Sequence, residues 1–216
     1  GIASTLRDLA LRIGREAVQR KLGLHHVSNV ATVLSHLSKH HSGVAPEDAE
    51  HAAAAADAYR PTAERRGEGY VPELSDRETA VFRPTARRPR ALVAFRGSEN
   101  YDDAKTDGHL ALGRLRDTAR WKRTAAHAKR LREVLGDYDV TGHSLGGTLA
   151  QHVHDEVLNK TGRLVAFNPG ATLLGPVPGR DGRVYSTRGD VVSALAHTTH
   201  KDVRVLTPKE GSDLLS

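Results

Sequence analysis

The stretch "DVTGHSLGGTLAQH", residues 139–152, decides the fold class of this chain. It begins with the short apolar run of a strand, passes through a His-Ser pair flanked by glycines, and continues with helical spacing. Gly142, His143, Ser144, Leu145 and Gly146 form the pattern G-x-S-x-G. Between a strand and a helix, this pattern predicts a nucleophile elbow, a tight turn that lifts a serine hydroxyl above the sheet edge.

The elbow also predicts a site that stabilises negative charge. The first N–H groups of a helix carry partial positive charge, and they would face a carbonyl that reacts with Ser144. The alternative is a glycine-rich turn with an incidental serine, because G-x-S-x-G alone is a weak pattern. The strand-turn-helix context favours the elbow.

The chain on both sides of this stretch alternates between strand and helix patterns. Short apolar runs predict strands at 79–84, 91–97, 163–170, 183–190 and 202–208. A basic helix is expected at 114–135, ending at Gly136, and another at 145–159. Alternation with nearly all-apolar strands indicates an α/β fold with a mostly parallel sheet covered by helices on both faces.

The first 60 residues have only helical patterns. A stripe from Ile2 to Ala17 predicts one helix, a second is expected from Ser28 or Asn29 to about Gly43, and "PEDAEHAAAAADAYRP" predicts a third at 46–61. We therefore expect a helical N-terminal region at 1–60, a polar linker or loop at 61–79, and the α/β core at 80–216. The basic run "RPTARRPR", residues 83–90, is interpreted as a solvated loop.

Composition limits the function classes. The chain has 216 residues, a net charge of +6, 13 histidines and no cysteine. Thiolate chemistry is thereby excluded, and acidic partners such as an anionic membrane surface are favoured. Nucleic acid is not expected as a partner, because the basic residues are dispersed and no recognition motif occurs. His36 and His40 could share a metal with other histidines, but solvated helix histidines are commoner, so neither metal nor cofactor is predicted.

The location of the protein is left open by the sequence. No apolar run is long enough to span a bilayer and no signal-peptide pattern occurs, so we expect a soluble, non-secreted or virion-associated protein that is possibly membrane-peripheral. The absence of methionine indicates a processed product, a fragment or a trimmed chain. "GIAST" at the start also fits a myristoylation pattern after loss of an initiator methionine.

Five motifs in a fixed order resemble the class 3 lipases of the α/β-hydrolase fold. They are "AFRGS" (94–98), "NYDDAKTD" (100–107), "TGHSLGG" (141–147), "AFNPG" (166–170) and "RGDVVS" (188–193). The resemblance covers roughly residues 79–208. It implies that Ser144 is the nucleophile, that Leu145 and Ser98 supply the oxyanion hole, and that Asp190 orients a histidine. The alternative for Asp190 is a turn aspartate. The segment that aligns with the family's lid, residues 99–113, is polar, so strong interfacial activation is not expected.

The catalytic histidine is the missing element of this resemblance. In this fold the order along the chain is Ser, Asp, His, with the histidine after the last strand, yet no histidine follows Pro208. His197 and His200 precede the last strand, and the side chain of His143 should point into the sheet. We therefore expect the histidine beyond Ser216.

Two functions remain open at this point. The first is a lipase-like serine hydrolase that cleaves carboxylic esters of lipids, phospholipid or acylglycerol, through an acyl-enzyme at Ser144. The second is a catalytically inactive hydrolase-fold protein with a structural or membrane-contact role, such as a processed virion component.

Overall fold

The computed structural model describes residues 45–98, 115–167, 182–187 and 203–206. Within them, six strands form one sheet in chain order: β1 (Thr79–Phe82), β2 (Leu92–Phe95), β3 (Asp139–His143), β4 (Leu164–Phe167), β5 (Arg183–Thr187) and β6 (Val203–Leu206). Strands β2 to β6 are parallel, and β1 is antiparallel to β2 at the edge. The predicted α/β fold with a mostly parallel sheet is confirmed.

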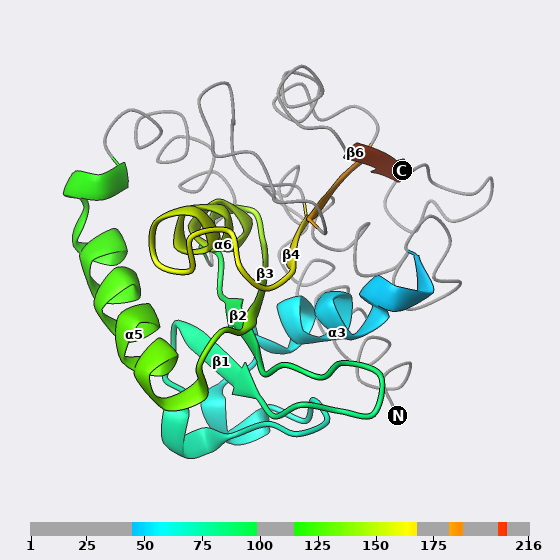
Figure 1. Cartoon of the computed structure of the whole chain (residues 1–216), viewed down its shortest axis with the longest axis horizontal. Helices are drawn as coiled ribbons and strands as arrows, with labels where there is room; N and C mark the ends of the chain where they lie inside the picture. Colours follow the sequence, from blue (N-terminus) through cyan, green and yellow to red (C-terminus); the bar gives the residue numbers. More distant parts are fainter. Residues whose placement is uncertain (1–44, 99–114, 168–181, 188–202, 207–216) are drawn as a thin grey trace, which may run out of the picture.

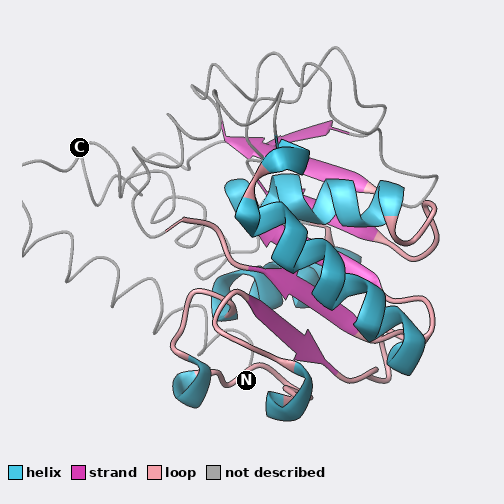
Figure 2. Ribbon diagram, turned by 90° about the vertical axis from the view of Figure 1, so that its left-hand side faces the viewer, coloured by secondary structure: helices cyan, strands magenta, loops and turns pink. Residues whose placement is uncertain are grey.

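Helices cover both faces of this sheet (Figures 1 and 2). On one face lies α3 (Ala49–Asp57), which follows the 3-10 turn η1 (Pro46–Asp48). On the other face lie α5 (Ala119–Leu135) and α6 (Leu145–Glu156). Three further 3-10 turns are η2 (Thr62–Glu64), η3 (Pro72–Leu74) and η4 (Leu115–Asp117). None of the helices within the described ranges is both long enough and apolar enough to cross a membrane.

The ends of α5 have the signals that the sequence predicts, although the helix begins later than residue 114. The Thr118 hydroxyl oxygen accepts a hydrogen bond from the Trp121 N–H at 3.1 Å and caps the first turn. The helix ends at Gly136, whose φ of 70° favours glycine. The two helices expected before Gly43 lie outside the described residues.

Residues 61–79 contact both α3 and β1. The guanidinium of Arg65 is buried and donates to the backbone oxygens of Ala58, Asp76 and Thr79 at 2.7–3.3 Å. These bonds hold the segment against the end of α3 and the start of β1. The division of the chain at residues 60 and 79 stays a prediction.

The basic run 83–90 connects β1 to β2, and most of it is exposed as expected. Arg88 is the exception: its side chain is buried, and its Nε lies 3.2 Å from Oε2 of Glu50 in α3. The interpretation of the whole run as solvated is therefore wrong for Arg88. The reason is that α3 places a carboxylate over the loop, which satisfies a buried guanidinium.

Candidate active site

Ser144 occupies a strained turn between β3 and α6. Its φ and ψ are 56° and −126°, a region of backbone conformation that side chains other than glycine rarely adopt. Such a conformation costs on the order of 1–3 kcal/mol and persists only where the surroundings hold it. Here the Ser144 N–H donates to the Phe167 carbonyl at 3.0 Å, and the Ser144 carbonyl accepts from the Thr148 N–H at 3.1 Å.

The two glycines of the G-x-S-x-G pattern are required by close backbone contacts. A Cβ on Gly142 would lie less than 3.0 Å from the carbonyl oxygen of Gly146. A Cβ on Gly146 would lie equally close to the carbonyl oxygen of Phe95 in β2. Helix α6 therefore packs directly on the ends of β2 and β3, which any larger residue at either position would prevent.

The register of the strands brings the ends of β2, β3 and β4 to one edge of the sheet. Phe95 pairs with Gly142, and His143 pairs with Phe167. Ser98 is half-buried and follows β2 by three residues, so it leaves the sheet at the same edge as Ser144. A Cβ on Gly97 would lie 2.8 Å from the His143 carbonyl oxygen, so the chain just before Ser98 packs against the elbow.

Leu145 is the first residue of α6 and is half-buried. The first intrahelical hydrogen bond is donated by the Thr148 N–H, so the N–H groups of residues 145–147 precede the helical ladder. They lie at the positive end of the α6 dipole, directly beside Ser144. This arrangement is suited to stabilising an oxyanion formed by attack of a serine hydroxyl on a carbonyl.

The remaining predicted site residue, Asp190, lies outside the described residues. It follows the last residue of β5, Thr187, by three positions. Since β5 is parallel to β4, the carboxyl end of β5 lies at the same edge as Ser144.

The side chain of His143, the residue before Ser144, is enclosed by the protein. Its side chain is buried, and its Nδ1 lies 2.8 Å from the Tyr59 hydroxyl oxygen. Burial lowers the pKa of His143 to about 4. Because this imidazole is buried against the Tyr59 hydroxyl, it is not placed to remove a proton from the adjacent Ser144.

A second histidine lies beside a carboxylate, but at the opposite edge of the sheet. The Nε2 of His51 is 3.5 Å from Oδ2 of Asp139, and both side chains are buried. Asp139 is the first residue of β3, so five residues of extended chain, roughly 16 Å, separate it from Ser144. This pair is therefore too far away to serve the elbow.

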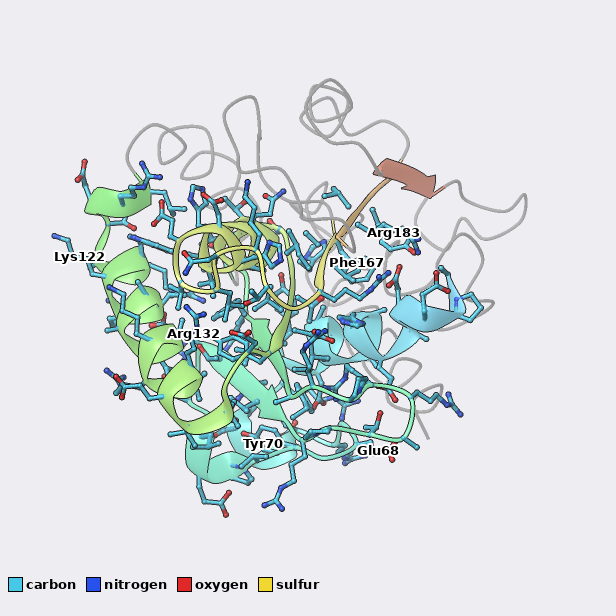
Figure 3. All side chains as sticks on the ribbon, viewed as in Figure 1. Glu68, Tyr70, Lys122, Arg132, Phe167 and Arg183 are labelled. Carbon is cyan, nitrogen blue, oxygen red and sulfur yellow. The ribbon has the colours of Figure 1, made fainter. Side chains whose placement is uncertain are left out.

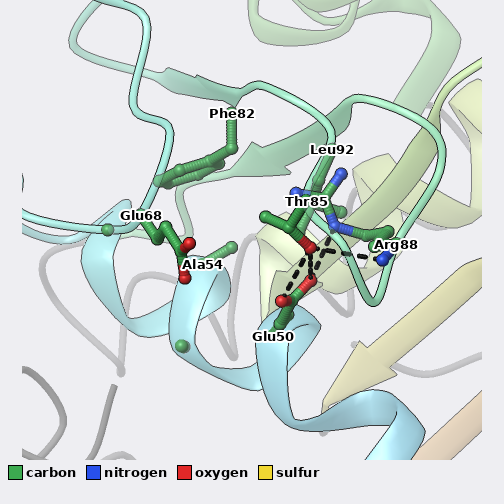
Figure 4. Close-up of a pocket in the computed structure, with 9 residues that line it drawn as sticks. Glu50, Ala54, Glu68, Phe82, Thr85, Arg88 and Leu92 are labelled. Carbon is green, nitrogen blue, oxygen red and sulfur yellow. Dashed lines mark hydrogen bonds and ion pairs between the residues drawn. The ribbon is translucent and has the colours of Figure 1, made fainter. Parts of the chain in front are cut away.

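The small cavity in Figure 4 also lies away from Ser144. It has a volume of about 20 Å³, room for roughly one water molecule, and lies between α3 and the start of β2. Its lining residues are Glu50, Ala53, Ala54, Gly67, Glu68, Phe82, Thr85, Arg88 and Leu92. The Glu50 carboxylate accepts from the Thr85 hydroxyl at 2.9 Å and pairs with Arg88, so the polar groups of this cavity hold the β1–β2 loop on α3.

No cluster of three or more potential metal ligands occurs among the residues that the structure describes. His36 and His40 lie outside those residues. Two residues next to the elbow have no role in the sequence-based prediction: Tyr59, and Gly97 within the motif "AFRGS". Tyr59 belongs to "DAYRP" at the end of a helix, 84 positions before its partner His143, and no motif links the two.

Comparison with known proteins gives the family. A family model for a Tle-like phospholipase domain, described as phospholipase-like, matches residues 37–162, which is more than half of the chain. The match includes Ser98, Ser144 and Leu145 and ends before Asp190. No curated protein matches the sequence. A lipase- or phospholipase-like family is thus supported, though not class 3 specifically, and lipid-ester hydrolysis is indicated at a general level. The chain belongs to the family of Tle-like phospholipase domains.

Proposed function

We propose that this protein hydrolyses carboxylic esters of lipids through an acyl-enzyme on Ser144. The observation that carries the proposal is the strained backbone of Ser144, held between two glycines that no larger residue could replace. Strain of this kind concentrates at functional sites, where the surrounding structure maintains it. The family match supports the same class of substrate.

In the proposed reaction, the Ser144 Oγ attacks the ester carbonyl carbon while a base takes the hydroxyl proton. The carbonyl π electrons move to oxygen, and the resulting oxyanion accepts hydrogen bonds from Leu145 and Ser98. Collapse of this intermediate expels the alcohol, which takes the proton from the base. Water then attacks the acyl-Ser144 ester by the same route and releases the fatty acid.

The acid and the base of this reaction are proposed from the order of the strands. Asp190 would orient the base, and the base would be a histidine that follows β6 in the chain. In support, β6 is parallel to β5, so its carboxyl end points to the Ser144 edge. His197 and His200 lie outside the described residues and precede β6 in sequence.

This assignment predicts that His197→Ala and His200→Ala change the rate of ester hydrolysis less than threefold. Loss of a true base lowers kcat by several orders of magnitude. Hydrolysis of a short-chain nitrophenyl ester by each variant and by the unaltered protein provides the measurement. A loss of a thousandfold in either variant would show that the triad closes through that residue.

The proposed lipid surface is anionic, and α5 offers the basic face. Lys122, Arg123, Lys129 and Arg130 are exposed along this helix, and Figure 3 shows Lys122 projecting away from it. An Arg120 side chain N–H donates to the Arg96 carbonyl at 2.7 Å, so the start of α5 lies next to the chain that leads to Ser98. A basic helix near the substrate edge favours phospholipid over neutral acylglycerol.

Vesicle binding tests this surface. The double variant Lys122→Glu/Lys129→Glu should bind phosphatidylglycerol vesicles more weakly than the charge-matched control Arg83→Glu/Arg87→Glu, whose residues lie in the exposed β1–β2 loop. Raising the salt concentration should weaken binding of the unaltered protein. Equal binding of both double variants would exclude α5 as the contact.

The decisive experiment on the reaction is kinetic. Ser144→Ala should lower kcat for a short-chain ester and for phospholipid vesicles by roughly 10³-fold or more. Ser75→Ala is the control, because the Ser75 hydroxyl donates to the Val71 carbonyl and accepts from the Val81 N–H, away from the elbow. Full activity of Ser144→Ala would overturn the proposed reaction. A protein that includes a histidine after β6 and is folded but inactive would favour the structural alternative.

A further inference from the structure

Tyr59, which immediately follows the C-cap of α3, reaches the elbow from the other face of the sheet. Its hydroxyl oxygen lies 2.8 Å from Nδ1 of His143 and 3.2 Å from the carbonyl oxygen of the same residue. The two aromatic rings meet edge to face, with centroids 5.8 Å apart. The hydroxyl therefore contacts both the side chain and the backbone of the residue that precedes Ser144.

The direction of these two hydrogen bonds follows from the number of protons. A tyrosine hydroxyl has one hydrogen, and the His143 carbonyl can only accept, so the hydroxyl donates to the carbonyl. The His143 Nδ1–H then donates to the hydroxyl oxygen. The His143 Nε2 then carries a lone pair and no hydrogen, and no group in the described part of the chain forms a hydrogen bond with it. The opposite assignment would bury an Nε2–H without an acceptor, which costs more.

These bonds hold one particular peptide group, the one between His143 and Ser144. Its carbonyl oxygen accepts from Tyr59, and its N–H donates to the Phe167 carbonyl at 3.0 Å. The orientation of this peptide sets φ of Ser144, which is 56°. It therefore also sets the direction of the Ser144 hydroxyl and of the Leu145 N–H.

The same hydroxyl also lies against the end of β2. A Cβ on Gly97 would come within 3.0 Å of the Tyr59 hydroxyl oxygen, so the close approach requires glycine there. Gly97 directly precedes Ser98, the second proposed oxyanion donor. One hydroxyl group thus contacts the two segments that would form the oxyanion hole.

We infer that Tyr59 is a positioning residue, which holds the His143–Ser144 peptide and the Gly97–Ser98 segment in the geometry needed for oxyanion stabilisation. The inference rests on the proposed function of Ser144. Tyr59 itself makes no contact with the reacting atoms in this mechanism, and it acts through the backbone of the elbow. Its loss should lower the rate of the chemical step and leave substrate binding unchanged.

The test compares Tyr59→Phe with Tyr138→Phe. Each variant keeps the ring and removes one hydroxyl, and Tyr138 is a fitting control because its buried hydroxyl donates to the Ala128 carbonyl at 2.8 Å, on the other face of the sheet. We expect similar shifts of the urea unfolding midpoint in both. Only Tyr59→Phe should lower kcat, roughly 10- to 100-fold, with KM within twofold of the unaltered protein.

A second measurement does not depend on turnover. In Tyr59→Phe the amide hydrogen of Ser144 should exchange with solvent at least tenfold faster by NMR, whereas in Tyr138→Phe it should not change. Unchanged exchange at Ser144, or equal loss of kcat in both variants, would overturn the role of Tyr59. A wild-type rate that does not depend on Ser144 would contradict the proposed function instead, which separates the two failures.

Discussion

The two faces of the sheet are built from different chemistry. The face under α5 and α6 is apolar: Val93, Phe95, Val140 and Ala166 of the strands pack against Trp121, Leu131, Leu149 and Val153 of the helices. The face under α3 holds many buried polar groups, among them Asp48, His51, Thr141, His143 and Tyr185. Small residues complete this face, since Ala54 and Ala58 pack near Ala80 and Ala94.

The difference teaches how one sheet both stabilises the fold and orients a site. Burial of apolar area is strong but not directional, so it fixes no single group to within tenths of an ångström. Hydrogen bonds are directional. Asp48, the N-cap of α3, accepts from the Tyr185 hydroxyl at 2.6 Å, from Arg183 at 2.7 Å and from Arg163 at 3.0 Å. These bonds tie the start of α3 to β5 and to the residue before β4. Tyr59 at the far end of α3 then reaches His143.

The largest effect on stability is expected from Asp48→Asn, which breaks the polar face. The substitution leaves two arginines without their buried carboxylate, and removing one partner of a buried pair costs about 3–5 kcal/mol of unfolding free energy. Asp155→Asn is the control, since Asp155 pairs with Lys160 at 3.5 Å near the surface, where such pairs contribute less than about 1 kcal/mol. Urea unfolding at pH 7 compares the three proteins.

The destabilisation caused by Asp48→Asn should decrease at low pH. Burial alone would raise the pKa of Asp48, but hydrogen bonds from Tyr185 and Arg163 outweigh it and hold the pKa below its ordinary 3.8. A lowered carboxyl pKa stabilises the fold above the unfolded value and loses that contribution as pH falls through the folded one. The difference between wild type and Asp48→Asn should be equal at pH 7 and 5 and smaller at pH 3. A difference that grows toward pH 3 would contradict this account.

Leu149→Ala tests the apolar face and should cost about 2–5 kcal/mol, because the Leu149 side chain of α6 is fully buried in the core and its truncation leaves a cavity. The loss should not change with pH between 7 and 3. Val134→Ala serves as its control, since that side chain is 67% exposed and its truncation should cost less than about 0.5 kcal/mol. If the loss of unfolding free energy in Leu149→Ala changed with pH, then pH dependence would not distinguish the polar face from the apolar face.

The smallest effect on the unfolding free energy is expected from Thr141→Val. This substitution removes one hydroxyl from the polar face and keeps the volume of the side chain nearly unchanged. The Thr141 hydroxyl donates to the Val165 carbonyl at 2.7 Å. Its loss should lower the unfolding free energy by about 1 kcal/mol in urea titration. A higher unfolding free energy in Thr141→Val would show that the buried Thr141 hydroxyl destabilises the fold.

Local patterns in the sequence predict the elements but not the pairing between them. The strands and the helices α3, α5 and α6 follow from apolar runs, caps and glycines, and Ser144 follows from its own short motif. Arg88 with Glu50, and Tyr59 with His143, are 38 and 84 positions apart. Neither residue of such a pair has a local signal, because its role depends on which helix lies over which strand.

The same reason explains why the polar face was missed. In sequence, the alanine run of α3 looks like an ordinary helix, and Asp48 like an acidic residue in a first turn. Only the sheet order reveals that Asp48 meets Arg163 and Arg183, which are more than 110 positions later. Ser98 and Leu145 were identified from the resemblance to lipases, and their roles stay predictions.

The most direct test of the central claim is the covalent labelling of Ser144. A fluorophosphonate probe reacts with a serine only where a base and an oxyanion site activate it, and peptide mapping by mass spectrometry identifies the modified residue. In the protein that includes a histidine after β6, we expect a single adduct, on the peptide that contains Ser144, and none in Ser144→Ala. An adduct that persists in Ser144→Ala, or that maps to a different serine, would contradict the assignment of Ser144 as the nucleophile.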